Sequence, residues 1–191
     1  MKKIVTVILF GMLCLQQFHV MADEQPSVAV YVHPDKLEHP VRIGLLPYYT
    51  HWVLVGDFAV KAAIKAFGAH YQQVGMCEDG KTSDLLVTVN PKIKHNPGIE
   101  KVFAEVQVEV YRADGSLLGE YTGQGDHDAQ MRSVFMDDAI HSAFNSAMQN
   151  AVSTFLADAE KQKIIADGLP KASTPLPCSL LSALGYARSS K

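Results

Sequence analysis

Residues 101–122 have the sequence KVFAEVQVEVYRADGSLLGEYT and contain the clearest structural signal in the chain. Within residues 101–110 a valine or alanine stands at every even position, and mostly polar residues stand between them. A period of two is that of a strand with one buried face and one wet face. Asp114 and Gly115 follow, a pair that supplies the positive φ of a tight turn. We therefore predict a β-hairpin whose second strand begins near Leu117.

The segments on either side of this hairpin complete an α+β pattern. Residues 41–46 and 85–90 are rich in Val, Ile and Leu, so we predict two further strands, the first buried on both faces. One helix is predicted from an N-cap at Asp57 to about Gly68, and a long amphipathic helix over roughly 133–165. We expect a single domain with a mixed or largely antiparallel sheet of four to five strands and two helices packed on one face.

Domain boundaries follow from the same pattern. Residues 23–40 are predicted as an extended N-terminal arm, in which 28–32 is either an edge strand or simply part of the arm, because prolines flank that segment. Residues 41–167 form the predicted domain, and 168–191 a C-terminal tail. Gly123-Gln124-Gly125 is predicted to break the return strand of the hairpin. The helix faces expected to pack on the sheet are Val60, Ile64, Phe67 and Tyr71 in the first helix and Ile140, Phe144, Ala147, Ala151 and Phe155 in the second.

Residues 1–22 are predicted to be a cleavable signal peptide. Lys2 and Lys3 form a positively charged start, and an apolar run of about a dozen residues follows. A short polar stretch follows. The side chains of Val20 and Ala22, three positions and one position before the expected cut, are small enough for signal peptidase, which fits cleavage before Asp23. The apolar run is shorter than the ~20 residues that a membrane-spanning helix needs. The alternative is a retained anchor helix.

A lipid anchor and a nucleic-acid partner are both disfavoured by the sequence. Lipoprotein processing at Cys14 requires a small preceding residue, and Leu13 is bulky. Loss of the leader removes two of the 17 basic residues and leaves 15 against 20 acidic ones, a net charge of −5. Nucleic acids and anionic membranes both require clustered basic side chains. We therefore expect no nucleic acid and no direct membrane anchor after cleavage.

Two cysteines remain after cleavage, Cys77 and Cys178. An even pair in an oxidising compartment is expected to form a disulfide. The bond would close a loop of about 100 residues, which the chain-entropy model values at up to ~4.7 kcal/mol. It would also pin the C-terminal tail to the domain. The alternative is two separate reduced thiols.

The order of elements resembles that of small Gram-negative envelope proteins. A strand like 41–46 is followed by a helix, a segment like 83–89 (SDLLVTV), a hairpin like 106–121 and a long Ala-rich helix like 137–159. This order is similar to that of the YajG-like lipoproteins, the auxiliary lipoproteins of ABC-type transport and the amino-terminal domain of TolB. The resemblance covers roughly 41–160 and implies a non-enzymatic accessory or assembly factor. It supplies no catalytic residues, and the absent lipobox means that outer-membrane anchoring does not carry over.

Two clusters are candidates for a functional site. Tyr48, Tyr49 and Trp52 follow the first predicted strand and suit a partner-binding patch, because aromatic rings bury a large area at low entropy cost. Packing against the core or a sheet edge is the alternative. Asp126, His127 and Asp128 could ligate zinc or manganese, although aspartates near a helix start often serve as caps.

Taken together, these features predict a periplasmic, non-enzymatic accessory, assembly or binding module of the cell envelope, without a cofactor. Its partner would be an envelope protein complex or a second copy of the chain. Two alternatives stay open: a metal-dependent or small-molecule-binding periplasmic enzyme, and a self-assembling structural envelope protein. No G-x-S-x-G elbow or phosphate-binding Gly-rich loop is present to favour an enzyme.

Overall fold

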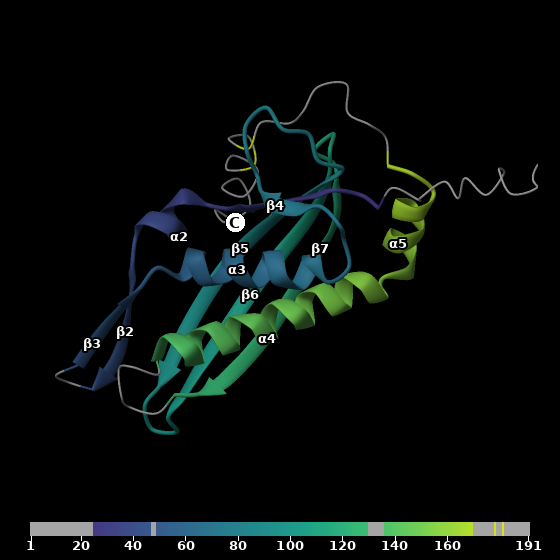
Figure 1. Ribbon diagram of the computed structural model, residues 1–191. Coiled ribbons are helices and arrows are strands. Elements are labelled where there is room, and N and C mark those ends of the chain that lie inside the picture. Colours follow the sequence, from purple (N-terminus) through teal and green to yellow (C-terminus); the bar gives the residue numbers. More distant parts are fainter. Residues whose placement is uncertain (1–24, 47–48, 130–135, 170–177, 179–180, 182–191) are drawn as a thin grey trace, which may run out of the picture.

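The computed structural model describes residues 25–46, 49–129 and 136–169, together with Cys178 and Leu181 (Figure 1). The strands are β1 (Val28–Val32), β2 (Val41–Leu46), β3 (Tyr49–Val53), β4 (Val74–Met76), β5 (Leu85–Asn96), β6 (Lys101–Arg112) and β7 (Leu117–Asp128). The helices are α2 (Pro34–Glu38), α3 (Val55–Gly68), α4 (Met136–Ala157) and α5 (Ala159–Ala166). None of these helices is both long enough and apolar enough to cross a lipid bilayer.

Five strands form one mixed sheet in the order β4-β1-β5-β6-β7. Strand β1 pairs in parallel with both β4 and β5, whereas β5, β6 and β7 form an antiparallel meander. The predicted turn joins β6 to β7, and Gly115 has a φ of 83° there. Strands β2 and β3 form a separate two-stranded hairpin. The structure thus confirms the predicted α+β fold and its mixed sheet.

Helices α3 and α4 cover one face of the five-stranded sheet (Figure 1). Helix α3 contacts β1, β4 and β5, and α4 contacts β6 and β7. The core lies between these two layers and is lined by alternate side chains of the strands. All five positions predicted for the packed face of the long helix are buried: Ile140, Phe144, Ala147, Ala151 and Phe155.

Helix α4 lies directly on the backbone of β7 at two glycines. A Cβ atom at Gly123 would overlap the carbonyl oxygen of Ala147 and lie 2.7 Å from the amide nitrogen of Ala151. A Cβ atom at Gly125 would overlap the carbonyl oxygen of Ala143 and lie 2.6 Å from the amide nitrogen of Ala147. The prediction that these glycines break the strand was wrong, since β7 continues through both. They permit the close approach of helix and strand.

The first two apolar runs occupy places different from those predicted. Val28–Val32 is neither an edge strand nor an arm: it is an internal strand between β4 and β5. Val41–Leu46 was predicted to be buried on both faces, but it pairs only with β3, and Val41 and Arg42 are exposed. Tyr49–Val53 forms the partner strand β3. Both runs have the composition of a strand. Which of them is buried inside the sheet is decided by the distant strands with which each one pairs, and the composition does not show that.

The helices also differ in detail from prediction. Helix α3 begins after Leu54, which makes no side-chain cap, and Asp57 lies within its first turn. The long helix is interrupted at Asp158, whose side chain caps α5 by accepting a hydrogen bond from the Lys161 amide. The buried face of α3 consists mainly of small residues, while Val60 and Ile64 are only half-buried. Its buried members are Val55, Gly56, Ala59, Ala62, Ala63, Ala66 and Phe67.

Tyr121 connects β7 to the junction between α4 and α5. Its ring meets the edge of Phe155 at 5.3 Å between centroids, and its hydroxyl donates to Asp158 Oδ2 at 3.0 Å. Burial raises the pKa of Tyr121 well above its ordinary value, and the hydrogen bond to Asp158 and that carboxylate's charge raise it further. Burial also raises the pKa of Tyr71.

We expect Tyr121→Phe to flatten the alkaline fall in stability. A raised pKa favours the protonated tyrosine in the folded state, so this contribution is complete below the unfolded pKa of about 10 and is lost as pH rises above it. Urea unfolding between pH 8 and 11 should show a shallower decline for the variant, with a loss of about 1 kcal/mol at neutral pH from the missing hydrogen bond. Identical slopes for both proteins would contradict this assignment.

Candidate functional site

The β2–β3 hairpin extends beyond the sheet and the helices, toward the lower left in Figure 1. Its strands are antiparallel, with Val41 opposite Val53, Arg42 opposite Trp52 and Ile43 opposite His51. Ile43 and Val53 are buried and belong to the main hydrophobic core. These contacts fix the base of the hairpin to the domain.

A side-chain contact fixes the hairpin further. His51 Nε2 lies 3.0 Å from Asp137 Oδ1, in the first turn of α4. Asp137 is well placed there, because the N-terminus of a helix favours negative charge. The two residues are 86 positions apart in the sequence. The hairpin is therefore held by apolar contacts at its base and by a polar contact to the neighbouring helix.

The remaining side chains of the hairpin base form an exposed apolar and basic surface. Trp52 is 61% exposed, the largest exposed fraction among the large apolar side chains that the structure describes. Arg42 is directly opposite on the same face and is also exposed, and Leu54, which follows β3, is partly exposed. We call Arg42, Trp52 and Leu54 the Trp52 surface.

The structure places Trp52 in solvent rather than in the core, and its role in binding a partner stays a prediction. Tyr48 lies outside the described residues, and Tyr49 is placed only as part of the β3 backbone. The sequence analysis missed Arg42 and Leu54. A signal was available for Arg42, because a charged residue inside an apolar run indicates an exposed position.

The candidate metal cluster does not form a common site. Asp126, His127 and Asp128 are consecutive in β7, so the alternation of a strand directs the two aspartates to one face and the histidine to the other. Lys101 Nζ lies 2.6 Å from Asp126 Oδ2 and 3.7 Å from Asp128 Oδ1. The hydrogen bond and charge of Asp126 raise the pKa of Lys101. Within the described ranges, no three His, Cys, Asp or Glu side chains gather as metal ligands.

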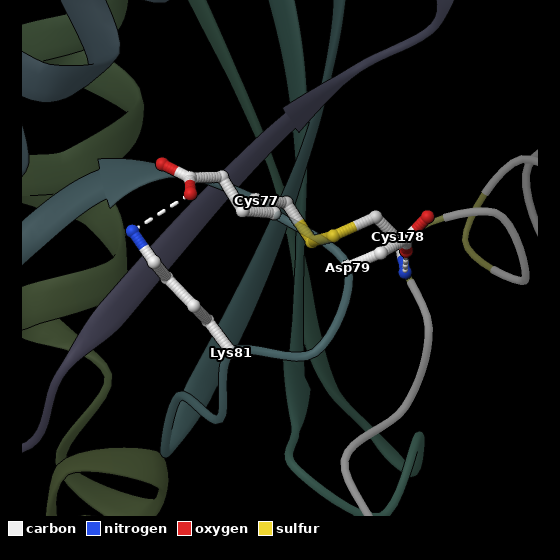
Figure 2. The surroundings of a disulfide bond; sticks show 5 residues. Cys77, Asp79, Lys81 and Cys178 are labelled. Carbon is white, nitrogen blue, oxygen red and sulfur yellow. Dashed lines mark hydrogen bonds and ion pairs between the residues drawn. A yellow bond between two sulfur atoms is a disulfide. The ribbon is translucent and has the colours of Figure 1, made fainter.

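Cys77 and Cys178 are joined by a disulfide, in agreement with the predicted pairing (Figure 2). Their Cα atoms are 5.9 Å apart, and the residues are separated by 101 positions. Asp79 Oδ1 accepts a hydrogen bond of 2.9 Å from the Cys178 amide. Leu181, a few residues further on, is buried against the sheet. The bond therefore connects the C-terminal segment to the loop after β4.

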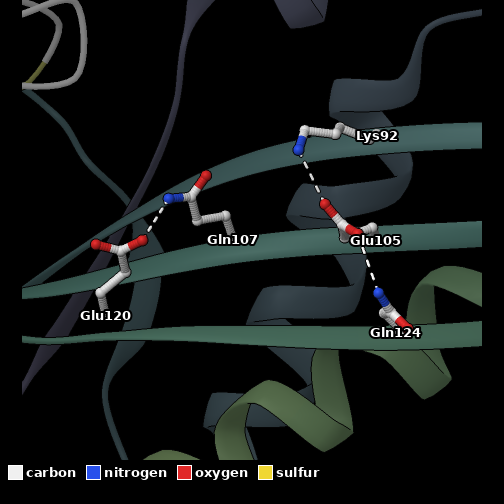
Figure 3. Close-up of polar contacts among 5 residues, drawn as sticks. All are labelled: Lys92, Glu105, Gln107, Glu120 and Gln124. Carbon is white, nitrogen blue, oxygen red and sulfur yellow. Dashed lines mark hydrogen bonds and ion pairs between the residues drawn. The ribbon is translucent and has the colours of Figure 1, made fainter. Parts of the chain in front are cut away.

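The face of the sheet opposite α3 and α4 carries rows of paired polar side chains (Figure 3). Lys92 Nζ donates to Glu105 Oε1 at 2.9 Å, and Gln124 Nε2 donates to Glu105 Oε2 at 3.1 Å. These contacts, led by the hydrogen bond from Lys92, lower the pKa of Glu105. Gln107 on β6 donates diagonally to Glu120 on β7. These polar side chains on the open face therefore form hydrogen bonds with one another across β5, β6 and β7.

Comparison with models of known protein families finds no family that matches, and comparison with curated proteins finds no relative. Among solved structures, a DUF330 protein from Xanthomonas campestris superposes with a TM-score of 0.50 and 10% sequence identity, covering 75% of this chain and 92% of its own. A protein from Caulobacter crescentus, provisionally described as a lipoprotein, gives a TM-score of 0.40 and 11% identity, with coverage of 75% and 93%.

Sequence identities this low show a shared fold and nothing further. The chain therefore has an architecture similar to that of the Xanthomonas DUF330 protein. The printed descriptions of the two structures name neither YajG-like lipoproteins nor TolB, so the resemblance to those families stays a prediction.

Proposed function

We propose that this chain is an exported accessory protein of the cell envelope, a binding module that contacts a protein partner through the Trp52 surface. The observation that carries the proposal is the exposed tryptophan beside Arg42 on a hairpin with a buried base. Trp and Arg are the side chains most enriched among residues that dominate binding energy at protein interfaces.

The firm base of the hairpin supports a role in binding. Ordering of a mobile loop on association costs free energy, and a surface that is already fixed avoids much of this cost. Ile43 and Val53 in the core, and the contact between His51 and Asp137, provide such fixation. The Trp52 side chain is thereby presented by a framework that need not rearrange on binding.

The leader and the disulfide support the proposed location. The sequence before Asp23 has the pattern of a signal peptide, and Cys77 and Cys178 are paired. Structural disulfides persist in oxidising compartments such as the bacterial periplasm and are rare in the cytosol. A periplasmic location is the reading that agrees with both features.

We expect Trp52→Ala to weaken partner binding by about thirty-fold, which corresponds to the ~2 kcal/mol typical of a dominant interface residue. Ile99→Ala is the matched control, because Ile99 is a large apolar side chain that is 56% exposed and distant in sequence from the hairpin. A photo-crosslinking amino acid introduced at position 52 or 99 in intact cells first identifies the partner, whose affinity for purified wild-type and variant proteins is then measured.

Crosslinks from position 52 but not from position 99, with loss of affinity only in Trp52→Ala, support the proposal. An adduct of twice the mass of the chain would identify the partner as a second copy. Equal affinity of the wild-type protein and Trp52→Ala would exclude this surface.

A further inference from the structure

Strand β7 is an outer strand of the five-stranded sheet and pairs with β6 on one side (Figure 1). It is 12 residues long and contains no proline, whereas β4 at the opposite edge has three residues. Proteins commonly protect an edge strand by keeping it short or by placing a proline in it. Neither device is present in β7, whose length allows a further strand to pair along it.

The backbone groups of alternate β7 residues point away from the sheet. Antiparallel pairing directs the N–H and C=O groups of every second residue toward the partner strand and those of the others outward. Gln124 belongs to the outward set, because its carbonyl oxygen accepts a 2.8 Å hydrogen bond from Asn150 Nδ2 on α4. The Leu85 amide, which bonds toward β1, gives the same alternation when the register is followed from β5 to β7. The outward residues are Glu120, Thr122, Gln124 and Asp126, which we call the β7 edge.

The β7 edge is accessible to another chain. All four of its residues are exposed. Within the part of the chain that the structure describes, the bond from Asn150 is the one hydrogen bond made to their outward backbone groups. An extended segment can therefore pair with this edge and continue the sheet, a recurring mode of peptide recognition.

The charge along this edge determines which kind of segment fits. Strand β7 carries three carboxylates and no Lys or Arg, and α4, which packs on it, carries two aspartates and no Lys or Arg. Lys101 of β6 pairs with Asp126 and Asp128, and one ammonium group against three carboxylates leaves a net charge of −2 along the strand. Pairing of two copies along this edge would bring rows of carboxylates together, and like charges on adjacent strands are destabilising.

We infer that the β7 edge is a docking site for an extended, basic segment of a protein partner, which adds to the sheet as a further strand. Backbone hydrogen bonds supply affinity, and Lys or Arg at alternate positions lies beside the carboxylates on the open face of the sheet. Asn150 releases the Gln124 carbonyl at the cost of one hydrogen bond. The acidic row thus favours a basic strand and opposes self-pairing.

This inference goes beyond the proposed function. The β7 edge and the Trp52 surface belong to different sheets, since Trp52 is part of the β2–β3 hairpin. Binding at one surface does not require binding at the other. The experiments below use peptides and variants that leave the hairpin unchanged.

Two peptides of about ten residues, long enough to span the edge, test the inference on the purified mature protein. Both alternate lysine with threonine, and the second has a backbone N-methyl group at every lysine. These are the residues whose amides face β7 when the lysine side chains lie on the open face. In fluorescence anisotropy we expect the unmodified peptide to bind at least about ten-fold more tightly, because the methylated one cannot donate these backbone hydrogen bonds.

Variants of the protein separate the contribution of the backbone from that of charge. Thr122→Pro removes an outward N–H and no hydrogen bond to β6, so the sheet should stay folded by circular dichroism while peptide affinity falls about five-fold. Glu120→Lys should weaken binding by a similar factor, since it reverses a charge beside the added strand. Glu38→Lys is the matched control, with the same change in net charge at an exposed position of α2.

Amide hydrogen exchange of the wild-type protein gives a readout that no variant can disturb. The unmodified peptide should slow exchange at Thr122 and Asp126, whereas the Tyr121 and Gly123 amides, which face β6, should be slow with and without it.

Equal binding of the two peptides would overturn the inference, because charge alone would then account for the attachment. Failure of the lysine peptide to bind, or equal loss of affinity in Glu38→Lys and Glu120→Lys, would also overturn it. Slow exchange at Thr122 and Asp126 in concentrated protein without peptide, lost on dilution, would overturn it in favour of pairing between two copies.

Discussion

Gly123→Ala is expected to lower the free energy of unfolding by on the order of 3 kcal/mol, although alanine normally stabilises a strand relative to glycine. The reason is the contact between α4 and β7. The new methyl group would overlap the carbonyl oxygen of Ala147 and approach the amide of Ala151, both of which are backbone atoms of the helix. Relief of the overlap requires α4 to move away from β7, and this movement loosens the core contacts of the helix.

Urea denaturation of the purified protein measures this effect. Gly75→Ala is the matched control, because Gly75 also lies in a strand and a Cβ atom there meets nothing within 4 Å. We expect the control to unfold within about 0.5 kcal/mol of the wild-type protein. Equal stability of the two alanine variants would show that α4 does not lie against β7 at this point.

Phe155→Ala is expected to cost about 3–5 kcal/mol of unfolding free energy, because it removes a fully buried ring and leaves a cavity. Phe155 lies between Phe67 of α3 and Tyr121 of β7, at 6.2 and 5.3 Å between ring centroids. The ring therefore joins both helices to the sheet. Its loss weakens three elements at once.

Thermal and urea unfolding of Phe155→Ala should be compared with Ser153→Ala, an exposed position on the same helix. The control is expected within about 0.5 kcal/mol of the wild-type protein. A loss below 1 kcal/mol for Phe155→Ala would contradict the packing of α4 described above.

The local patterns of the sequence were sufficient for the antiparallel part of the fold. The alternation in residues 101–110 and the turn at Asp114-Gly115 predicted the β6–β7 hairpin, because neighbouring strands joined by a tight turn leave their signal in one continuous stretch. The apolar face of α4 was correct for a similar reason, since helical spacing is a local property.

The errors arise where burial depends on distant parts of the chain. Val28–Val32 pairs in parallel with residues more than 40 positions away, and no local pattern distinguishes such a strand from an edge strand or from Val41–Leu46. The pair Gly123 and Gly125 was interpreted as a strand break from its composition alone. The actual role of the two glycines is to let α4 approach β7 closely, and this role depends on where the helix packs in the folded chain.

The candidate site was predictable to a similar extent. Trp52 and the aromatic residues beside it stood out in the sequence, but the exposure of Trp52 could not be derived, because the contact between His51 and Asp137 and the burial of Ile43 are long-range features. The disulfide was predictable because only Cys77 and Cys178 lie outside the predicted leader.

Intact-mass spectrometry of the protein isolated from its native cells without reductant tests the central claim, export followed by oxidation, most directly. We predict a chain that begins at Asp23 and lacks two hydrogen masses relative to the reduced sequence, with Cys77 and Cys178 in one crosslinked peptide after digestion. A chain that retains Met1 through Ala22, or one in which both cysteines react as free thiols, would contradict it.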